Sequence, residues 1–303
     1  MKTILIAIAF LITVPSQVFA TNCPPPPTPL RQLIEQAEFI VTGTVNSIED
    51  VELSYYVGKK VDLQISQVLQ GQVVETSISF FLEAYLPFDS HEDITVGAAL
   101  MAFMVYSEED NIYTPAGYHT SFKLLDNEGM TVHKERIKEL QVINMFKDEK
   151  RREVLTTNWL IDCAENPHTR FDGVSELYPY SNYMRYYDAE LEEYVQRITF
   201  TDIQKNRIRN IILATEEYQF FDLMLVDTIG AWNDKEVYDQ VVAFIRTLDS
   251  DHLWSYSSFF YRIAYGTQRE ELTELLEKIQ NLDYDDTFED RANEIAAEFV
   301  KML

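Results

Sequence analysis

The chain has 303 residues, of which 46% are apolar and 13% aromatic, so it can build sizeable cores and is not a wholly disordered chain. It carries 50 acidic and 25 basic residues, a net charge of −25. Nucleic acids and anionic membrane surfaces are both bound by clustered Lys and Arg, so this charge argues against either as a partner. The length favours two domains.

The first 20 residues have the layout of a secretory signal peptide. Lys2 gives a positive start, residues 4–14 form an apolar run, and Val18-Phe19-Ala20 supplies the small residues of a cleavage site. The run is too short to span a bilayer comfortably, and no later stretch approaches a membrane span. We therefore expect cleavage after Ala20 and a secreted or periplasmic protein without a membrane span.

The next segments predict an extended leader and then a strand-rich domain. Residues 21–29 include CPPPPTP, and proline disfavours both helix and central strand. Residues 30–130 begin with a short helix, marked by Leu30, Leu33 and Ile34. Apolar runs then predict strands at residues 39–45, 61–65, 76–82, 100–106 and 122–124. Five or six strands beside one short helix favour a small closed or partly closed barrel.

Residues 131–303 change to a helical period and are predicted to be all α-helical. Apolar helical patterns begin at six positions: Thr201, Glu217, Asp234, Asp251, Thr267 and Thr287. Thr201 with Gln204, and Thr267 with Glu270, fit the capping-box pattern. The starts at 201, 234 and 267 lie 33 residues apart, and those at 217, 251 and 287 lie 34 and 36 residues apart. This spacing favours stacked helical hairpins in a short solenoid over a generic bundle. The predicted fold class is α+β and multidomain.

Three pieces of the first half occur in the order found in a known family. They are AEFIVTGTV at residues 37–45, VLQG at 68–71 and VGAALMAF at 96–103, and they follow Cys23 and the short helix. This order resembles the netrin-like domain, the OB-like barrel of tissue inhibitors of metalloproteinases and their bacterial relatives. The resemblance covers residues 23–125. It implies an OB-like barrel for the first domain.

The sequence departs from that family where the family's inhibitory chemistry lies. In the inhibitors, the mature chain begins at a cysteine whose amine and carbonyl chelate a protease zinc. After cleavage at Ala20, Cys23 would be the third residue, and the usual second leader cysteine is Pro25. The resemblance therefore implies the fold and not the inhibitory mechanism. In the helical half, the tetratricopeptide pattern is not visible, and NPHTR at residues 166–170 is similar to an inter-helix turn of HEAT-like repeats.

No motif indicates catalysis, a metal or a cofactor, so we assign no residue to these roles. The chain contains neither His-Glu-x-x-His nor Gly-x-Ser-x-Gly. Acidic stretches at residues 89–93 and 283–286 lack the full frame of a calcium loop. Cys23 and Cys163 are an even pair in an exported chain and could form one disulfide. The alternative is that Cys163 is a small buried residue near Trp159.

The best binding-site candidate is a segment crowded with tyrosines. Tyrosine and arginine are both enriched in binding hot spots, because each joins a large contact area to hydrogen-bonding groups. The predicted partner surface consists of Tyr178, Tyr180, Tyr183, Arg185, Tyr186, Tyr187 and Tyr194. The alternative is that these rings pack a helix junction and cap the repeats that begin at Thr201.

Together these features predict an exported, non-enzymatic binding or scaffold protein whose partner is an extracellular or periplasmic protein. A metalloprotease inhibitor of the tissue-inhibitor type is the first alternative, and it would require Cys23 to be the first mature residue. A hydrolase with dispersed active-site residues is the second alternative.

Overall fold

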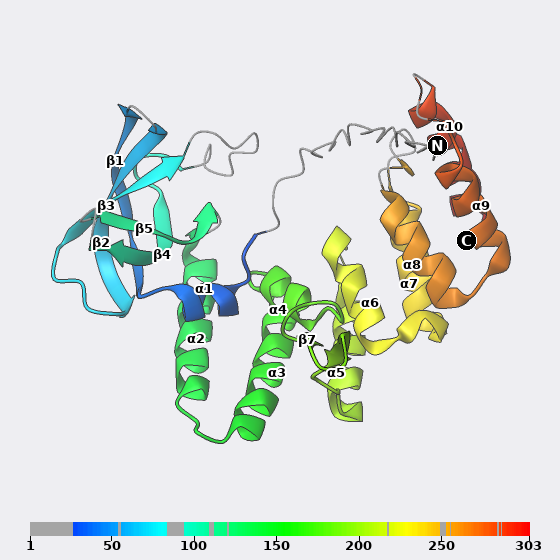
Figure 1. The fold of residues 1–303 in the computed structure, drawn as a ribbon, viewed down its shortest axis with the longest axis horizontal. Helices are drawn as coiled ribbons and strands as arrows, with labels where there is room; N and C mark the ends of the chain where they lie inside the picture. The colour runs from blue at the N-terminus through cyan, green and yellow to red at the C-terminus, as the bar shows by residue number, and fades with distance from the viewer. Residues whose placement is uncertain are drawn as a thin grey trace, which may run out of the picture.

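The computed structural model describes residues 27–53, 56–83, 94–108, 112–119, 121–216, 218–248, 253–254, 256–283, 285 and 287–303. The predicted signal peptide, its cleavage site and Cys23 lie outside the described residues. The described chain is α+β: a closed barrel is followed by a row of helices that leads away from it (Figure 1).

Five strands close the barrel and a short sixth strand extends it. They are β1 (Phe39–Leu53), β2 (Tyr56–Gln70), β3 (Ser77–Glu83), β4 (Ala99–Ser107), β5 (Ile112–His119) and β6 (Phe122–Leu124). The order is β1-β2-β3-β5-β4, and antiparallel pairing of β1 with β4, for example Thr42 with Met101, closes the ring. The β3–β5 pair is parallel, and β6 pairs with β4.

The alternation seen in the sequence gives the barrel its interior. Val41 and Val45 of β1, Val61 and Leu63 of β2, and Phe80 of β3 are buried in one apolar cluster. This confirms the strands predicted from period-two patterns. Strand β1 also needs a glycine: a Cβ at position 43 would lie 2.3 Å from the Gln64 carbonyl oxygen.

Strand β4 is apolar on both faces because each face meets a different core. Leu100 and Met104 belong to the barrel interior. Met101 and Phe103 belong to a second cluster, which contains α1 (Leu30–Gln36) and much of the helical region. The helix α1 lies where the barrel meets the helices (Figure 1). One continuous apolar core therefore runs from the outer face of the barrel into the helical region.

Nine α-helices of the described chain follow the barrel. They are α2 (Asn127–Asn144), α3 (Glu149–Glu165), α4 (Arg170–Leu177), α5 (Asp202–Ala214), α6 (Leu223–Ile229), α7 (Lys235–Ile245), α8 (Ser257–Thr267), α9 (Glu270–Gln280) and α10 (Phe288–Met302). Helix α3 packs on α2, α4 and α5, whereas α9 packs on both α8 and α10. None of the helices in the described part of the chain is both long and apolar enough to cross a membrane.

Two of the predicted helix starts are confirmed by their caps. Thr201 closes a capping box with Gln204 before α5, and the Asp234 carboxylate accepts from two backbone N–H groups of α7. The predicted box at Thr267 is wrong. Thr267 is the last residue of α8, where its hydroxyl donates to the Ile263 carbonyl at 2.6 Å, and Gln268 then adopts a left-handed φ of 56°.

The remaining starts are later than predicted or lack a side-chain cap. Glu217 and Asp251 lie outside the described residues. The next α-helices along the chain begin at Leu223 and Ser257. Thr287 precedes α10 without capping it through its side chain.

The prediction of an all-helical second half is wrong at one place. Residues 185–196 form an antiparallel hairpin of β7 (Arg185–Asp188) and β8 (Glu193–Gln196) between α4 and α5. Tyrosine and valine favour strands, and Glu192 takes a left-handed φ of 55° that lets the chain turn back.

Candidate functional site

The β7–β8 hairpin carries most of the predicted partner surface. Its register pairs Arg185 with Gln196 and Tyr187 with Tyr194. Residues that face each other across an antiparallel pair point to the same side, so Arg185, Tyr187 and Tyr194 share one face of the hairpin. Tyr186, opposite Val195, points to the other face.

Five side chains on this side form a continuous stack, which we name the tyrosine–arginine ladder: Tyr178, Tyr180, Arg185, Tyr194 and Tyr187. The rings of Tyr178 and Tyr180 meet edge to face, with centroids 5.2 Å apart. The Arg185 guanidinium lies over two rings, 4.6 Å from the Tyr180 centroid and 4.3 Å from that of Tyr194. The Tyr194 and Tyr187 rings are 5.4 Å apart, again edge to face. Cation–π and edge-to-face contacts hold these side chains in place.

One end of the ladder is fixed to the helical region. Arg262 of α8 lies 4.9 Å from the Tyr178 centroid, and its Nη2 donates to the Tyr178 hydroxyl at 3.1 Å. Asp227 of α6 accepts from the same guanidinium. In the middle of the ladder, Arg185 Nε donates to the Tyr180 carbonyl at 3.2 Å.

The free part of the ladder is open to solvent. Tyr180, Tyr187 and Tyr194 are 60%, 54% and 60% exposed, although large aromatic side chains are usually well buried. Tyr186 on the opposite face is also exposed. A cluster of exposed rings held in fixed positions has the character of a binding surface.

Tyr183 does not belong to this surface, which corrects the sequence prediction. It is only 6% exposed, its hydroxyl lies 2.9 Å from Thr157 Oγ1, and its ring stacks under the Arg31 guanidinium. Burial raises the pKa of Tyr183 to about 12. Tyr183 therefore packs the junction, as the alternative reading proposed, while its exposed neighbours do not. The sequence alone could not separate the two roles, because all six tyrosines lie within one short segment.

The hairpin turn adds negative charge beside the ladder. Glu190 and Glu192 lie in the turn, Asp188 and Glu193 are the paired strand residues that flank it, and residues 188–193 contain no basic residue. The Asp188 carboxylate accepts from the backbone N–H groups of Glu190 and Leu191, which shapes the turn. The side chain of Leu191 at the tip is exposed.

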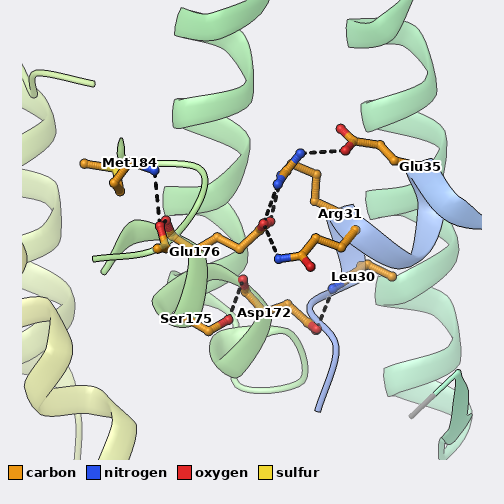
Figure 2. A network of polar contacts seen from close by, with 9 residues as sticks. Leu30, Arg31, Glu35, Asp172, Ser175, Glu176 and Met184 are labelled. Atoms are coloured by element: carbon orange, nitrogen blue, oxygen red, sulfur yellow. Dashed lines mark hydrogen bonds and ion pairs between the residues drawn. The ribbon is translucent and has the colours of Figure 1, made fainter. Parts of the chain in front are cut away.

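A second polar cluster, missed by the sequence analysis, lies buried where α1 meets α4 (Figure 2). Arg31 donates to Glu176 through Nε at 2.8 Å and through Nη2 at 2.6 Å, and Gln32 Nε2 donates at 3.0 Å. The Asp172 carboxylate accepts from the Leu30 backbone N–H at 2.9 Å and from Lys123 Nζ at 3.0 Å. The bonds from residues 30–32 join segments more than a hundred residues apart, and Lys123 lies 49 residues from Asp172, so no local pattern could have shown them.

Helix α4 can present these two acids to α1 because it approaches α3 very closely. A Cβ at position 173 would lie 2.3 Å from the Ala164 backbone nitrogen, so only glycine fits between Asp172 and the α3 backbone. The side chains of Asp172 and Glu176 are almost completely buried, and each is neutralised by a cation from the barrel side. The cluster therefore works as a structural latch.

His133 of α2 lies at the edge of this latch. Its Nδ1 is 2.8 Å from the Gly129 carbonyl, and its Nε2 lies 3.8 Å from Asp172 Oδ2. Within the described residues Nε2 has no hydrogen-bond partner. Burial, and then the nearby Lys123 cation, lower the pKa of His133. The buried imidazole is thus harder to protonate than an exposed one.

Cys163 on α3 is fully buried and has no disulfide partner among the described residues, and burial raises the pKa of its thiol well above the usual value. Because Cys23 lies outside the described residues, a bridge between the two stays a prediction. Among the described residues, no three His, Cys, Asp or Glu side chains are grouped so as to hold a metal ion. No protein-family model matches the chain, and no curated protein matches it either.

Proposed function

We propose that the protein is an exported, non-enzymatic binding or scaffold protein that docks a partner protein on the tyrosine–arginine ladder. The observation that carries this proposal is the exposure of Tyr180, Tyr187 and Tyr194 in a stack already held by Arg185. Tyr and Arg dominate binding hot spots, and rings that are ordered in advance lose little entropy when a partner binds.

The competing role of the segment, as a cap on the helical region, is met by those of its residues that are buried or tied to the helices. Tyr183 and the neighbouring Met184 are buried, and Tyr178 is tied to Arg262. The three exposed rings add little to the core, so packing does not account for them.

The barrel and the helical region support this proposal by analogy with folds that bind partners. We propose that the barrel is OB-like, since its order β1-β2-β3-β5-β4 is closed by β1 and includes a parallel β3–β5 pair. We propose that the helices form HEAT-like repeats, since α5 packs on α7 and α6 on α8 as successive hairpins of a solenoid do. Both architectures commonly present partner surfaces.

Capture of a partner tests the proposal. The purified chain is exposed to the extracellular or periplasmic fraction of its source and crosslinked, and retained proteins are compared among Tyr187→Ala, Tyr194→Ala and the wild type. Tyr265→Ala is the matched control, because Tyr265 is an equally exposed tyrosine on α8 outside the ladder. We expect both ladder variants to lose a partner that the control retains. Equal capture by all three variants would reject the ladder as the binding surface.

A further inference from the structure

We infer that the partner binds as an extended, basic segment that adds a third strand along the outer edge of β8. This inference rests on the proposed function and names the chemistry of the partner. It follows from three features of the hairpin: an open strand edge, the register of that edge, and the charge of the adjacent turn.

The hairpin is a two-stranded sheet of its own, and within the described residues neither strand pairs with any other strand. An unpaired edge presents backbone N–H and C=O groups that can pair with another chain. The edge of β7 is occupied at its start, because the Arg185 backbone N–H donates to the Ser181 carbonyl at 3.1 Å. The edge of β8 is therefore the one available to an added strand.

The register shows which groups β8 offers. The Arg197 N–H donates to the Met184 carbonyl at 2.8 Å, which makes residues 184 and 197 a hydrogen-bonded pair. Because such pairs alternate along antiparallel strands, Tyr187–Tyr194 and Arg185–Gln196 are non-hydrogen-bonded pairs. The backbone groups of Tyr194 and Gln196 thus point away from β7, along the outer edge.

The side chains beside this edge fit a strand as a ligand. Tyr194 stands on the ladder face, where the nearest side chain of an added strand would pack against its ring as a cross-strand neighbour. A strand bound here would gain both backbone hydrogen bonds and the aromatic contact, which is how strand addition combines affinity with specificity.

The negative charge at the turn favours a partner segment with positive charge. A strand along β8 passes four acidic residues in the turn and at its two flanks, so Lys or Arg in the added segment would be favoured: Asp188, Glu190, Glu192 and Glu193. A second copy of this chain is disfavoured as the occupant, because the chain has a net charge of −25 and is repelled by an acidic turn.

Selection from a phage-displayed library of random linear peptides on the full purified chain tests this inference. We expect enriched peptides to carry Lys or Arg at alternate positions. They should bind Gln196→Pro about tenfold more weakly than Gln196→Thr, because proline removes the outward N–H and leaves the bonds between β7 and β8 intact. Both variants lose the bond from Gln196 Nε2 to the Ile198 carbonyl, so they are matched.

Chemically modified peptides give a second readout that does not depend on the folding of the proline variant. N-methylation of one set of alternate backbone amides in the enriched peptide should abolish binding, whereas methylation of the other set should leave it largely intact. Equal effects of the two sets would overturn strand addition.

The other outcomes separate this inference from the proposed function. Failure to enrich any peptide, enrichment of acidic or proline-rich peptides, or a chain dimer that Gln196→Pro dissociates would overturn the basic strand as the occupant of β8. The partner surface would still stand if Tyr187→Ala and Tyr194→Ala lost their captured protein. Basic peptides that pair with β8 while those tyrosine variants capture normally would instead reject the ladder.

Discussion

Replacement of Arg31 by methionine should strongly destabilise the whole chain. The variant removes two of the three donors to Glu176, whose side chain is only 1% exposed, and leaves Gln32 as the remaining donor. A hydrogen bond to a charged group contributes about 1.5–3 kcal/mol, and loss of one partner of a buried ion pair costs about 3–5 kcal/mol. Both routes predict that Arg31→Met lowers the free energy of unfolding by about 3–5 kcal/mol.

Two further variants show whether the cost comes from the stranded charge. The double variant Arg31→Met/Glu176→Leu removes both charges, so it should recover most of the loss, since apolar replacement of a buried pair is often close to neutral. Arg207→Met is the matched control. Arg207 Nη2 contacts Asp162 at 2.6 Å and Glu165 at 2.9 Å, but these partners are exposed, so the expected cost is at most about 1 kcal/mol.

Urea unfolding of the full chain, followed by circular dichroism and by tryptophan fluorescence, measures these differences. The reasoning is refuted if Arg31→Met costs no more than Arg207→Met, or if the double variant is less stable than Arg31→Met alone.

Three other predictions concern the segment of tyrosines, the junction histidine and the leader. Tyr183→Ala should lower the free energy of unfolding by about 3–5 kcal/mol and Tyr187→Ala by only about 0.5 kcal/mol, as measured by urea unfolding; similar costs would contradict the division into a buried and a docking tyrosine. His133 has a lowered pKa in the folded chain, so below pH about 6.5 the unfolded chain binds more protons and stability should fall as the pH falls, by up to about 1.4 kcal/mol per pH unit from this group. His133→Asn should remove that part of the slope between pH 7 and pH 5, and an unchanged slope would assign the pH dependence to other groups. Exported protein should begin at Thr21 on N-terminal sequencing, whereas a chain that begins at Cys23 would revive the inhibitor alternative.

Local patterns predicted those parts of the fold that local physics determines. Alternation located β1, β2 and β3, since one buried face needs an apolar residue at every second position, as Val61 and Leu63 show. It missed β5 (Ile112–His119), where Pro115 and Gly117 had indicated a turn. The capping-box pattern, here Thr201 followed by Gln204, located the start of α5. The same pattern failed at Thr267, because its hydroxyl can also bond back to the preceding turn of α8.

Features made by distant residues could not be predicted from local patterns. The latch joins Arg31 to Glu176 across the whole barrel sequence, and an isolated carboxylate gives no sign of its partner. The β7–β8 hairpin was missed because the segment has no apolar face to alternate, since Tyr186 and Tyr187 are both exposed. The composition of the tyrosine segment predicted a partner surface, but only packing separates the buried Tyr183 from the ladder.

The row of helices has a consequence for local unfolding of the chain. Packing runs from α5 to α7, from α6 to α8, and then through α9 to α10, so each helix is supported mainly by its neighbours in the row. Among the described helices, α10 has α9 as its main neighbour, so it can detach at a smaller cost than a helix that packs on several others. The barrel, closed by β1 and β4, has no comparable free end. Amide hydrogen exchange should therefore be faster in α10 than in α3, which packs on three helices, or in β4, which pairs with three strands.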